Sequence, residues 1–528
     1  MIHSLKYTGN ELDKLLDDSA VAKTKSDKAY EIFNDGFKVD VEYKGSTKTI
    51  LSHNKEGLIV ASRTNGNKLP ILKVVDQENL SSPTLDLYYD KIEGTIKPSI
   101  TIEPNKLVLP GNPGAGVGLA TDESLIALGL KKMEGSENPH SENFGNYIHT
   151  ATGSIMVYIP KHYVKITNDT NEPYRGLRVD ISLTEEPDYW LPRVFINNNK
   201  IHEGIFIDKY TNTYSLDYGI NGSVPVSKKG KVPITSNAMT YLRNPNGSGN
   251  NTLNDISAAI EISKLRGSNY FVEHWASRSM LNYISDACWQ AAYRAAFIDL
   301  TIEKPEDICA WANMEPYRPR GNGNNGIDLH DELVRYTPDK IVSGRCLVAS
   351  CEDSQFAKIT HNGQRCGITD ISGNMWSFCH GYYHTYVTKE STDIVTLTRN
   401  DCLATNVPSN GKFVKLNATT YTSNNRWLGN GTTMPFDNET NRQSNGYLLN
   451  ALGIPNSNAV TSGSHKRYGC TVYYNQNTSN SNLLYGANWG NSDGGPRDCY
   501  CGADFSYSGT NVGFRLAAYS SEASSINS

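Results

Sequence analysis

Runs of lysine or arginine are missing from the chain, and its charge is nearly balanced. Its 528 residues include 50 basic and 55 acidic side chains, which gives a net charge of −5 at pH 7. Proteins that bind nucleic acid or an anionic membrane surface usually concentrate positive charge on one face. We therefore expect no nucleic-acid partner and no binding to a membrane surface.

Long apolar runs are missing as well. The N-terminus, MIHSLKYTGNELDKLLDD, has neither the basic start nor the apolar centre of a signal peptide, and no later stretch is long enough to cross a bilayer. We therefore expect that the chain does not insert into a membrane. We expect it to fold in a reducing cytoplasm. In that setting the 10 cysteines are expected to be buried free thiols.

Metal-binding patterns are scarce. The spacings of four cysteines match no pair of zinc knuckles: Cys346, Cys351, Cys366 and Cys379. Three histidines have no carboxylate at ligand spacing and are expected in loops, solvated or in ordinary hydrogen bonds: His361, His380 and His384. The sequence thus predicts no metal and no cofactor.

Turn-forming residues, in contrast, are abundant. The chain has 44 glycines, 22 prolines and many asparagines, which is typical of a β-rich protein with many turns. A chain of this length usually forms two to four folded units. We predict an α+β, β-rich fold.

An N-terminal all-β module is predicted over residues 1–110. Apolar and polar residues alternate at 38–43, and further apolar runs lie at four places separated by turn residues: 58–61, 69–75, 85–89 and 96–102. A short helix is predicted at 11–16. Glycine and proline are dense at 109–118, which we interpret as a hinge. We assign 111–200 to a linker and strand region, and 201–528 to the main domain.

Two helices are predicted in the main domain. Asn254 or Asp255 caps the first, and Gly267 follows it as a stop. Its apolar face consists of four residues: Ala258, Ala259, Ile262 and Leu265. The second helix is expected from about 272 to 297, with three polar side chains left in water: Arg278, Asp286 and Gln290. The polar, aromatic stretches 313–339 and 391–482 are predicted to be functional loops.

The stretch 367–381, GITDISGNMWSFCHG, combines a turn of small residues with a tryptophan strand. Its order Gly-x-x-Asp-x-Ser-Gly-Asn-x-Trp resembles the signature of the formylglycine-generating-enzyme-like branch of the C-type lectin fold. Residues 511–517, Asn-Val-Gly-Phe-Arg-Leu-Ala, resemble the closing strand of that branch, and 204–210 resemble its opening strand. Residues 154–161 resemble a strand common in phage tail proteins with this fold.

This resemblance implies a C-terminal C-type lectin-like fold with a set of scaffold residues: Gly373, Asn374, Trp376, Trp489, Gly513, Phe514 and Arg515. Many such proteins are displayed on phage tail fibres, and some are variable proteins of diversity-generating retroelements. It therefore implies a non-enzymatic receptor-binding protein of the virion tail, made in the host cytoplasm. Its expected partners are a host surface receptor, protein or glycan, and other tail proteins through the N-terminal module. A homo-oligomer, with a trimer favoured, is also expected.

Residues 484–507, LYGANWGNSDGGPRDCYCGADFSY, have the composition of a binding surface. Tyrosine supplies contact area at low entropic cost, and asparagine and serine supply adaptable hydrogen bonds, as in antibody paratopes. The order of glycines, Trp489 and Asn491 resembles the variable region of retroelement-diversified phage proteins. The predicted ligand-binding residues are Tyr485, Asn488, Asn491, Ser492, Asp493, Arg497, Asp498 and Tyr500.

Two other functions remain open. One is a formylglycine-generating-like oxidase, whose family binds copper with a cysteine pair; the candidates here are Cys470, Cys499 and Cys501. The enzyme pattern, however, places its cysteines further upstream and farther apart, so we predict no catalytic residues. The other is a variable binding protein encoded by a cell.

Overall fold

The computed structural model describes residues 3–8, 37–43, 46–54, 57–64, 67–74, 85–87, 102–168, 177–197, 200–298, 320–321, 327–328, 330–331, 334–342, 344–371, 373–388, 391–397, 413–416, 425–427, 471–473, 480–486, 488–489 and 499–525. The chain forms two compact units, Met1–Thr101 and Ile102–Ser528. As predicted, its described part is rich in strands and has few helices.

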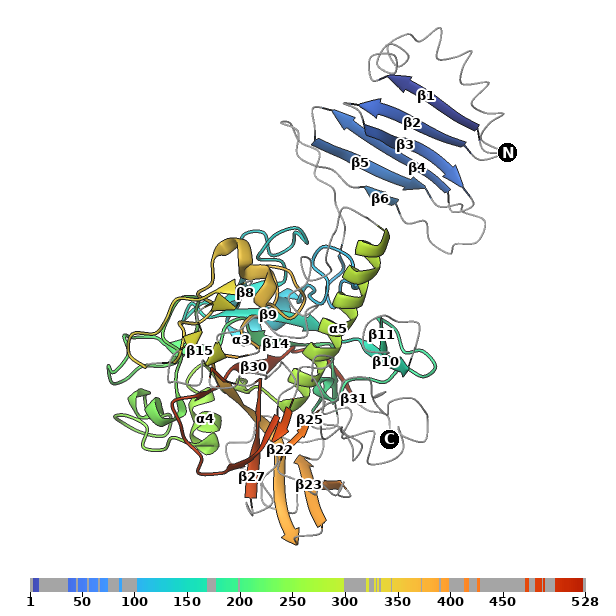
Figure 1. The fold of residues 1–528 in the computed structure, drawn as a ribbon. Coiled ribbons are helices and arrows are strands. Elements are labelled where there is room, and N and C mark those ends of the chain that lie inside the picture. The colour runs from blue at the N-terminus through green and yellow to red at the C-terminus, as the bar shows by residue number, and fades with distance from the viewer. Residues whose placement is uncertain are drawn as a thin grey trace. The chain divides into compact units, whose positions relative to one another are not determined.

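The first unit contains a six-stranded sheet in sequence order (Figure 1). Its strands are β1 (His3–Thr8), β2 (Phe37–Tyr43), β3 (Ser46–Asn54), β4 (Gly57–Thr64), β5 (Asn67–Val74) and β6 (Leu85–Leu87). β1 and β2 are parallel, and the later neighbours are antiparallel. The alternating or apolar runs at 38–43, 58–61, 69–75 and 85–89 all contribute strands, whereas β3 was not predicted. The proposed helix at 11–16, and all but the last residue of the run at 96–102, lie outside the described residues.

The second unit has a central six-stranded sheet ordered β17, β30, β14, β9, β8, β7. These strands are β7 (Leu130–Lys132), β8 (Asn146–His149), β9 (Ile155–Pro160), β14 (Gly204–Asp208), β17 (Phe271–Val272) and β30 (Leu516–Tyr519). β14 lies between β9 and β30 and is antiparallel to both. The strands predicted at 154–161 and 204–210 are therefore confirmed, whereas the predicted strand at 511–517 contributes only its last two residues to β30. The sheet joins the two ends of the unit.

A second sheet of eight strands runs in the order β24, β23, β22, β27, β28, β26, β25, with β29 paired to β22. These strands are β22 (Trp376–Thr388), β23 (Ser391–Leu397), β24 (Phe413–Leu416), β25 (Asn425–Trp427), β26 (Thr471–Tyr473), β27 (Asn480–Tyr485), β28 (Cys499–Asp504) and β29 (Val512–Gly513). β27 is a central strand, because it pairs with β22 on one side and β28 on the other.

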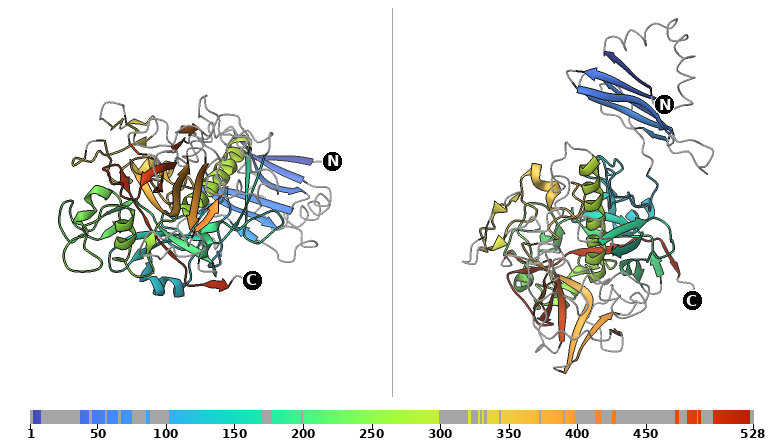
Figure 2. Two further views of the ribbon diagram at one scale, coloured as in Figure 1. Left: turned by 90° about the horizontal axis from the view of Figure 1, so that it is seen from below. Right: turned by 45° about the vertical axis from the view of Figure 1, so that its right-hand side comes forward.

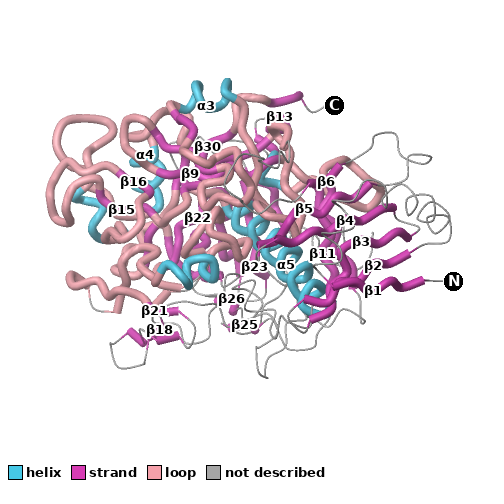
Figure 3. Tube along the Cα trace, turned by 90° about the horizontal axis from the view of Figure 1, so that it is seen from above, coloured by secondary structure: helices cyan, strands magenta, loops and turns pink. Residues whose placement is uncertain are grey.

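Smaller sheets and loops complete the unit, and loops make up much of its path (Figure 3). The short pairs are β10 (Tyr163–Asn168) with β11 (Leu177–Ser182), β15 (Asn212–Tyr214) with β16 (Pro225–Ser227), β18 (Arg320–Gly321) with β19 (Ile327–Asp328), and β20 (His330–Asp331) with β21 (Val334–Arg335). A three-stranded sheet contains β12 (Ile196–Asn197), β13 (Lys200–His202) and β31 (Ala523–Ser525).

Two of the helices were predicted. α4 (Ile256–Ser263) begins at Asp255, whose side chain accepts a hydrogen bond from Ala258 N at 3.0 Å. α5 (Trp275–Ile298) crosses the second unit (Figure 2). The structure also contains α3 (Asp122–Leu128) and the 3₁₀ helices η2 (Arg193–Phe195), η3 (Ser236–Tyr241) and η5 (Asp353–Ile359). Among the described residues, no helix is both long and apolar enough to span a membrane.

The expectation that the polar face of α5 stays wet is wrong. Arg278, Asp286 and Gln290 are only 3%, 6% and 2% exposed. The helix packs against β11 and η2 as well as β22 and β27, so the core surrounds it over much of its length. Two of these side chains have partners inside the protein: Arg278 pairs with Glu273, and Gln290 Oε1 accepts a hydrogen bond from Val179 N at 3.0 Å.

The hinge predicted at 109–118 is also wrong, because this segment packs into the core. Ala115 and Val117 are buried together with Leu107, which belongs to the same cluster. Gly116 has a positive φ of 77°, and a Cβ there would lie 2.5 Å from Ile284 Cγ2. Glycine thus permits close packing here, not flexibility. Residues 102–110 likewise belong to the second unit and not to the N-terminal module.

Candidate functional site

The predicted turn at 373–374 adopts the left-handed backbone conformation that glycine and asparagine tolerate. Gly373 and Asn374 have φ values of 70° and 57°, in the left-handed region. Trp376 follows and is 5% exposed. Its backbone N donates to Asn511 O at 2.8 Å, and it is paired with Val512 in the parallel β22 and β29 ladder. The turn is therefore joined directly to the closing strand of the unit.

Two polar side chains of the turn region hold a neighbouring segment. Asp370 Oδ2 accepts a hydrogen bond from Ala349 N at 2.6 Å. Asn374 Oδ1 accepts from Cys346 N at 2.9 Å, and its Nδ2 donates to Cys346 O at 3.0 Å. All these side chains are buried, so the bonds are shielded from competing water. The Asp and Asn of the motif thus fix residues 346–349.

The backbone of the same turn holds the start of the predicted binding segment. Gly373 N donates to Gly486 O at 2.6 Å, and Trp489 N donates to Asn374 O at 3.1 Å. Gly486 has a φ of 93°, and a Cβ there would lie 2.7 Å from Ile371 O. Trp489 is half-buried, with its ring against Gly344. The chain is therefore anchored on both sides of residue 487.

The other end of the segment returns to the same place in the sheet. Tyr485, the last residue of β27, is paired with Cys499, the first residue of β28. Residues 486–498 are therefore the connection of an antiparallel strand pair, and its two ends lie side by side. β28 in turn contributes Tyr500, whose ring centroid is 6.3 Å from that of Trp376.

The predicted outward orientation of Tyr485 is wrong. Its side chain is fully buried, in the core cluster that also contains Cys379, while the preceding Leu484 is buried in the cluster of Trp376. Successive residues of a strand point to opposite faces, so both faces of β27 are covered at this end. Tyrosine occurs both at surfaces and in cores, so the residue type alone could not show that the second face of β27 is covered.

Of the other seven predicted ligand-binding residues, two can be assessed by their exposure and five cannot be assessed. Asn488 is only 8% exposed, so its expected exposure is wrong as well. Tyr500 is half-buried. Five others lie outside the described residues and stay predictions: Asn491, Ser492, Asp493, Arg497 and Asp498.

Arg515 is a scaffold residue, as expected, and is fully buried. Its Nη1 donates to Asp208 O at 3.2 Å and Lys209 O at 3.1 Å, and its Nη2 donates to Thr369 O. Burial lowers the pKa of this guanidinium to about 10, so it remains charged at neutral pH. It joins β14 to the loop before the turn.

The histidines and cysteines divide into confirmed and mistaken predictions. The described cysteines Cys288, Cys346, Cys351, Cys366 and Cys379 are buried free thiols, as expected. The loop prediction is wrong for His380 and His384, which lie on β22. It is confirmed for His361, which lies in a turn and makes ordinary hydrogen bonds, although its side chain is buried. His361 Nδ1 accepts a hydrogen bond from Ile368 N at 3.0 Å, and burial lowers its pKa to about 4. The side chains of Cys499 and Cys501 lie outside the description.

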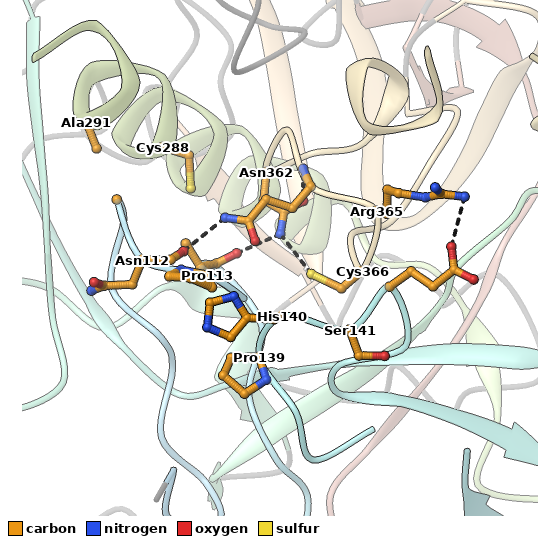
Figure 4. Close-up of a pocket in the computed structure, with 14 residues that line it drawn as sticks. Asn112, Pro113, Pro139, His140, Ser141, Cys288, Ala291, Asn362, Arg365 and Cys366 are labelled. Carbon is orange, nitrogen blue, oxygen red and sulfur yellow. Dashed lines mark hydrogen bonds and ion pairs between the residues drawn. The ribbon is translucent and has the colours of Figure 1, made fainter. Parts of the chain in front are cut away.

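A cavity of about 470 Å³ lies elsewhere in the second unit, beside α5 (Figure 4). It was not predicted from the sequence, because four segments distant in the chain form its walls: 111–115, 139–142, α5 and 362–366. No residue of 484–507 lines it.

Comparison with known proteins establishes no family for this chain. No protein-family model matches it, and no curated protein does. Among solved structures, the Major Tropism Determinant U1 variant is similar at 10% sequence identity and a TM-score of 0.25, over 90% of this chain and 82% of that chain. A TM-score this low carries no inference about fold or function.

Proposed function

We propose that the chain is a receptor-binding protein of a phage tail. In this proposal a C-type lectin-like scaffold displays residues 486–498 and adjoining strand positions to a host surface receptor, protein or glycan. The protein is a binding module of the virion and not an enzyme. Its N-terminal β unit attaches it to other tail proteins, and it assembles as a homo-oligomer, with a trimer favoured.

The observation that carries this proposal is how the polar segment is anchored. The bonds from Gly373 N to Gly486 O and from Trp489 N to Asn374 O fix one end, and the pairing of Tyr485 with Cys499 places the other end beside it. A rigid base reduces the entropy that a binding segment loses when it meets its partner. The segment itself is rich in the residue types of paratopes.

An alanine scan from 484 to 507 tests the proposal, with folding and adsorption to host cells measured separately. We expect Arg497→Ala to weaken binding by about 2 kcal/mol or more while leaving the melting temperature nearly unchanged. Arg178→Ala is the matched control, since Arg178 lies on β11, in a different sheet from β27 and β28. Tyr485→Ala should instead destabilise the fold, because its ring is buried. If every folded variant of the segment still adsorbs normally, receptor contact lies elsewhere.

Copper analysis separates the proposal from the oxidase alternative. The purified chain is expected to carry no stoichiometric copper and to leave cysteine-containing peptides unoxidised. Tight copper binding that disappears in Cys499→Ser, together with loss of peptide oxidation, would contradict the binding-module assignment.

A further inference from the structure

The walls of the cavity beside α5 are joined by two side-chain amides, those of the half-buried Gln364 and the buried Asn362. Gln364 Nε2 donates to Asn112 O at 3.0 Å, and Gln364 Oε1 accepts from Gly114 N at 2.6 Å. Asn362 Nδ2 donates to Ala115 O at 2.6 Å. The glycine- and proline-rich wall is therefore fixed against the 362–366 loop, and the hollow is formed before any ligand arrives.

A buried lysine ties the two loops at the cavity rim. Lys209 is 3% exposed, and its Nζ donates to Glu142 O at 3.1 Å and Arg365 O at 2.8 Å. The side chains of these two rim residues also pair, with Arg365 Nη2 2.9 Å from Glu142 Oε2. The two rim loops are thus joined twice, by Lys209 through their backbone carbonyls and by the surface ion pair between Arg365 and Glu142.

Positive charge exceeds negative charge around this rim. Arg365 and Glu142 line the cavity and pair with each other, and Lys229 pairs at 2.8 Å with Asp353, which lies 4.0 Å from Arg365. The ammonium of Lys209 bonds to backbone carbonyls, so three cations lie near two carboxylates. Burial lowers the pKa of Lys209 to about 8, which leaves it mostly charged at pH 7. The Arg365 side chain is 45% exposed, so its guanidinium can turn toward a solute.

The buried residues that line the cavity are apolar, or have polar groups that are already hydrogen-bonded within the protein. Pro139, Ala115 and Ala291 contribute hydrocarbon surface, and Cys288 and Cys366 contribute buried thiols (Figure 4). Burial raises the pKa of the Cys366 thiol, so this group is uncharged at neutral pH. The side-chain amides of Asn362 and Gln364 are already hydrogen-bonded to residues 112–115. A charged ligand group would therefore be bound at the rim.

We propose that this cavity binds a compact carboxylate, whose charged group pairs with Arg365 and whose body lies on the inner apolar surface. A guanidinium matches a carboxylate with two parallel hydrogen bonds, which gives both energy and orientation. A free organic acid and the terminal uronic acid of a glycan share this chemistry. The site is independent of the proposed receptor surface, since the segment 484–507 contributes no lining residue.

Calorimetric titration of the full chain tests the proposal with four probes: benzoate, glucuronate, and their uncharged counterparts benzamide and glucose. We expect one carboxylate to bind and its uncharged counterpart to bind at least about tenfold more weakly. Benzoate binding alone indicates a free organic acid, and glucuronate binding alone indicates an acidic sugar. Binding of neither carboxylate, or equal binding of charged and uncharged probes, overturns the proposal.

Matched variants locate the binding. Arg365→Gln should weaken carboxylate binding at least about tenfold, whereas Arg178→Gln removes a comparably exposed arginine, 47% against 45%, from another ion pair and should change nothing. Ala291→Leu narrows the cavity from α5 and should weaken binding of whichever carboxylate binds, without affecting the ion pair between Arg365 and Glu142. Melting temperatures of all three variants establish that they fold. Undiminished binding in folded Arg365→Gln and Ala291→Leu would show that the carboxylate binds elsewhere.

Discussion

Trp376 shows how much one side chain of the motif can contribute to the scaffold. Its ring is 5% exposed and packs in the cluster that contains Phe514, Val512 and Leu484. Trp376→Ala should lower the free energy of unfolding by about 3–5 kcal/mol, because truncation leaves a cavity between two sheet segments. Denaturant unfolding measures the loss, and Trp376→Phe should lose less because more of the ring volume remains. An unchanged midpoint for the alanine variant would contradict this role.

Asp370 makes the stability of the unit depend on pH. Burial raises its pKa from 3.8 to about 6, although Arg515 opposes the shift. The folded chain therefore holds this proton more tightly than the unfolded chain does. Its contribution to stability is full below about pH 4 and is lost as pH rises to about 6, by up to about 3 kcal/mol.

Asp370→Asn isolates that contribution. The asparagine oxygen can still accept the hydrogen bond from Ala349 N, but it carries no charge. The unfolding free energy of the variant minus that of the parent should therefore rise between pH 4 and pH 6 and be level above. Taking the difference cancels the opposite slope of His361, whose pKa is lowered to about 4. A difference that does not vary with pH would mean that Asp370 does not titrate in this range.

At the scale of elements, α5 depends on a buried ion pair. Arg278 Nε lies 2.9 Å from Glu273 Oε2, and both side chains are nearly inaccessible. Arg278→Met should destabilise the chain by about 3–5 kcal/mol, because Glu273 is left buried and unpaired. The double variant with Glu273→Gln should recover much of that loss. A double-mutant cycle measures the coupling, and the exposed pair of Arg178 and Asp180 should show about 1 kcal/mol or less. Equal coupling in the two cycles would contradict the prediction.

Elements with local signals were predictable from the sequence, whereas burial from several sides was not. Asp255 and the spacing of apolar residues identified α4, and a resemblance to the strands of a known fold placed β9 and β14. α3 was missed although Thr121 caps it and Gly129 ends it with a φ of 65°, because a helix of 7 residues is too short to show a clear apolar period. The burial of Tyr485 and Arg278 arises from segments distant in the chain.

The same distinction applies to the candidate site. The turn at Gly373 and Asn374 followed from residue types alone, since few residues tolerate a positive φ. That this turn holds Gly486 and Trp489 depends on a chain separation of more than a hundred residues, which a local pattern cannot encode. The cavity at Arg365 is hidden for the same reason.

At the scale of the whole molecule, the division between the two units can be tested by truncation. The second unit starts at Ile102, and its first residues belong to its own core: Leu107 is buried in the main cluster, and Asn105 N donates to Leu119 O at 2.7 Å. A fragment of residues 102–528 should therefore fold alone and unfold at the same denaturant midpoint as this unit in the full chain. If the proposed function holds, it should also adsorb to host cells.

A fragment that begins at residue 111, within the segment predicted to be a hinge, is the matched control. It lacks Leu107 and also Val108, whose N donates to Val117 O at 3.0 Å and whose O accepts from Gly116 N at 2.9 Å. Loss of the buried leucine alone should cost about 2–5 kcal/mol. Residues 111–528 should therefore unfold at a clearly lower denaturant concentration than 102–528. Equal midpoints would mean that residues 102–110 do not support the core, and a midpoint for 102–528 well below that of the full chain would mean that the first unit stabilises the second.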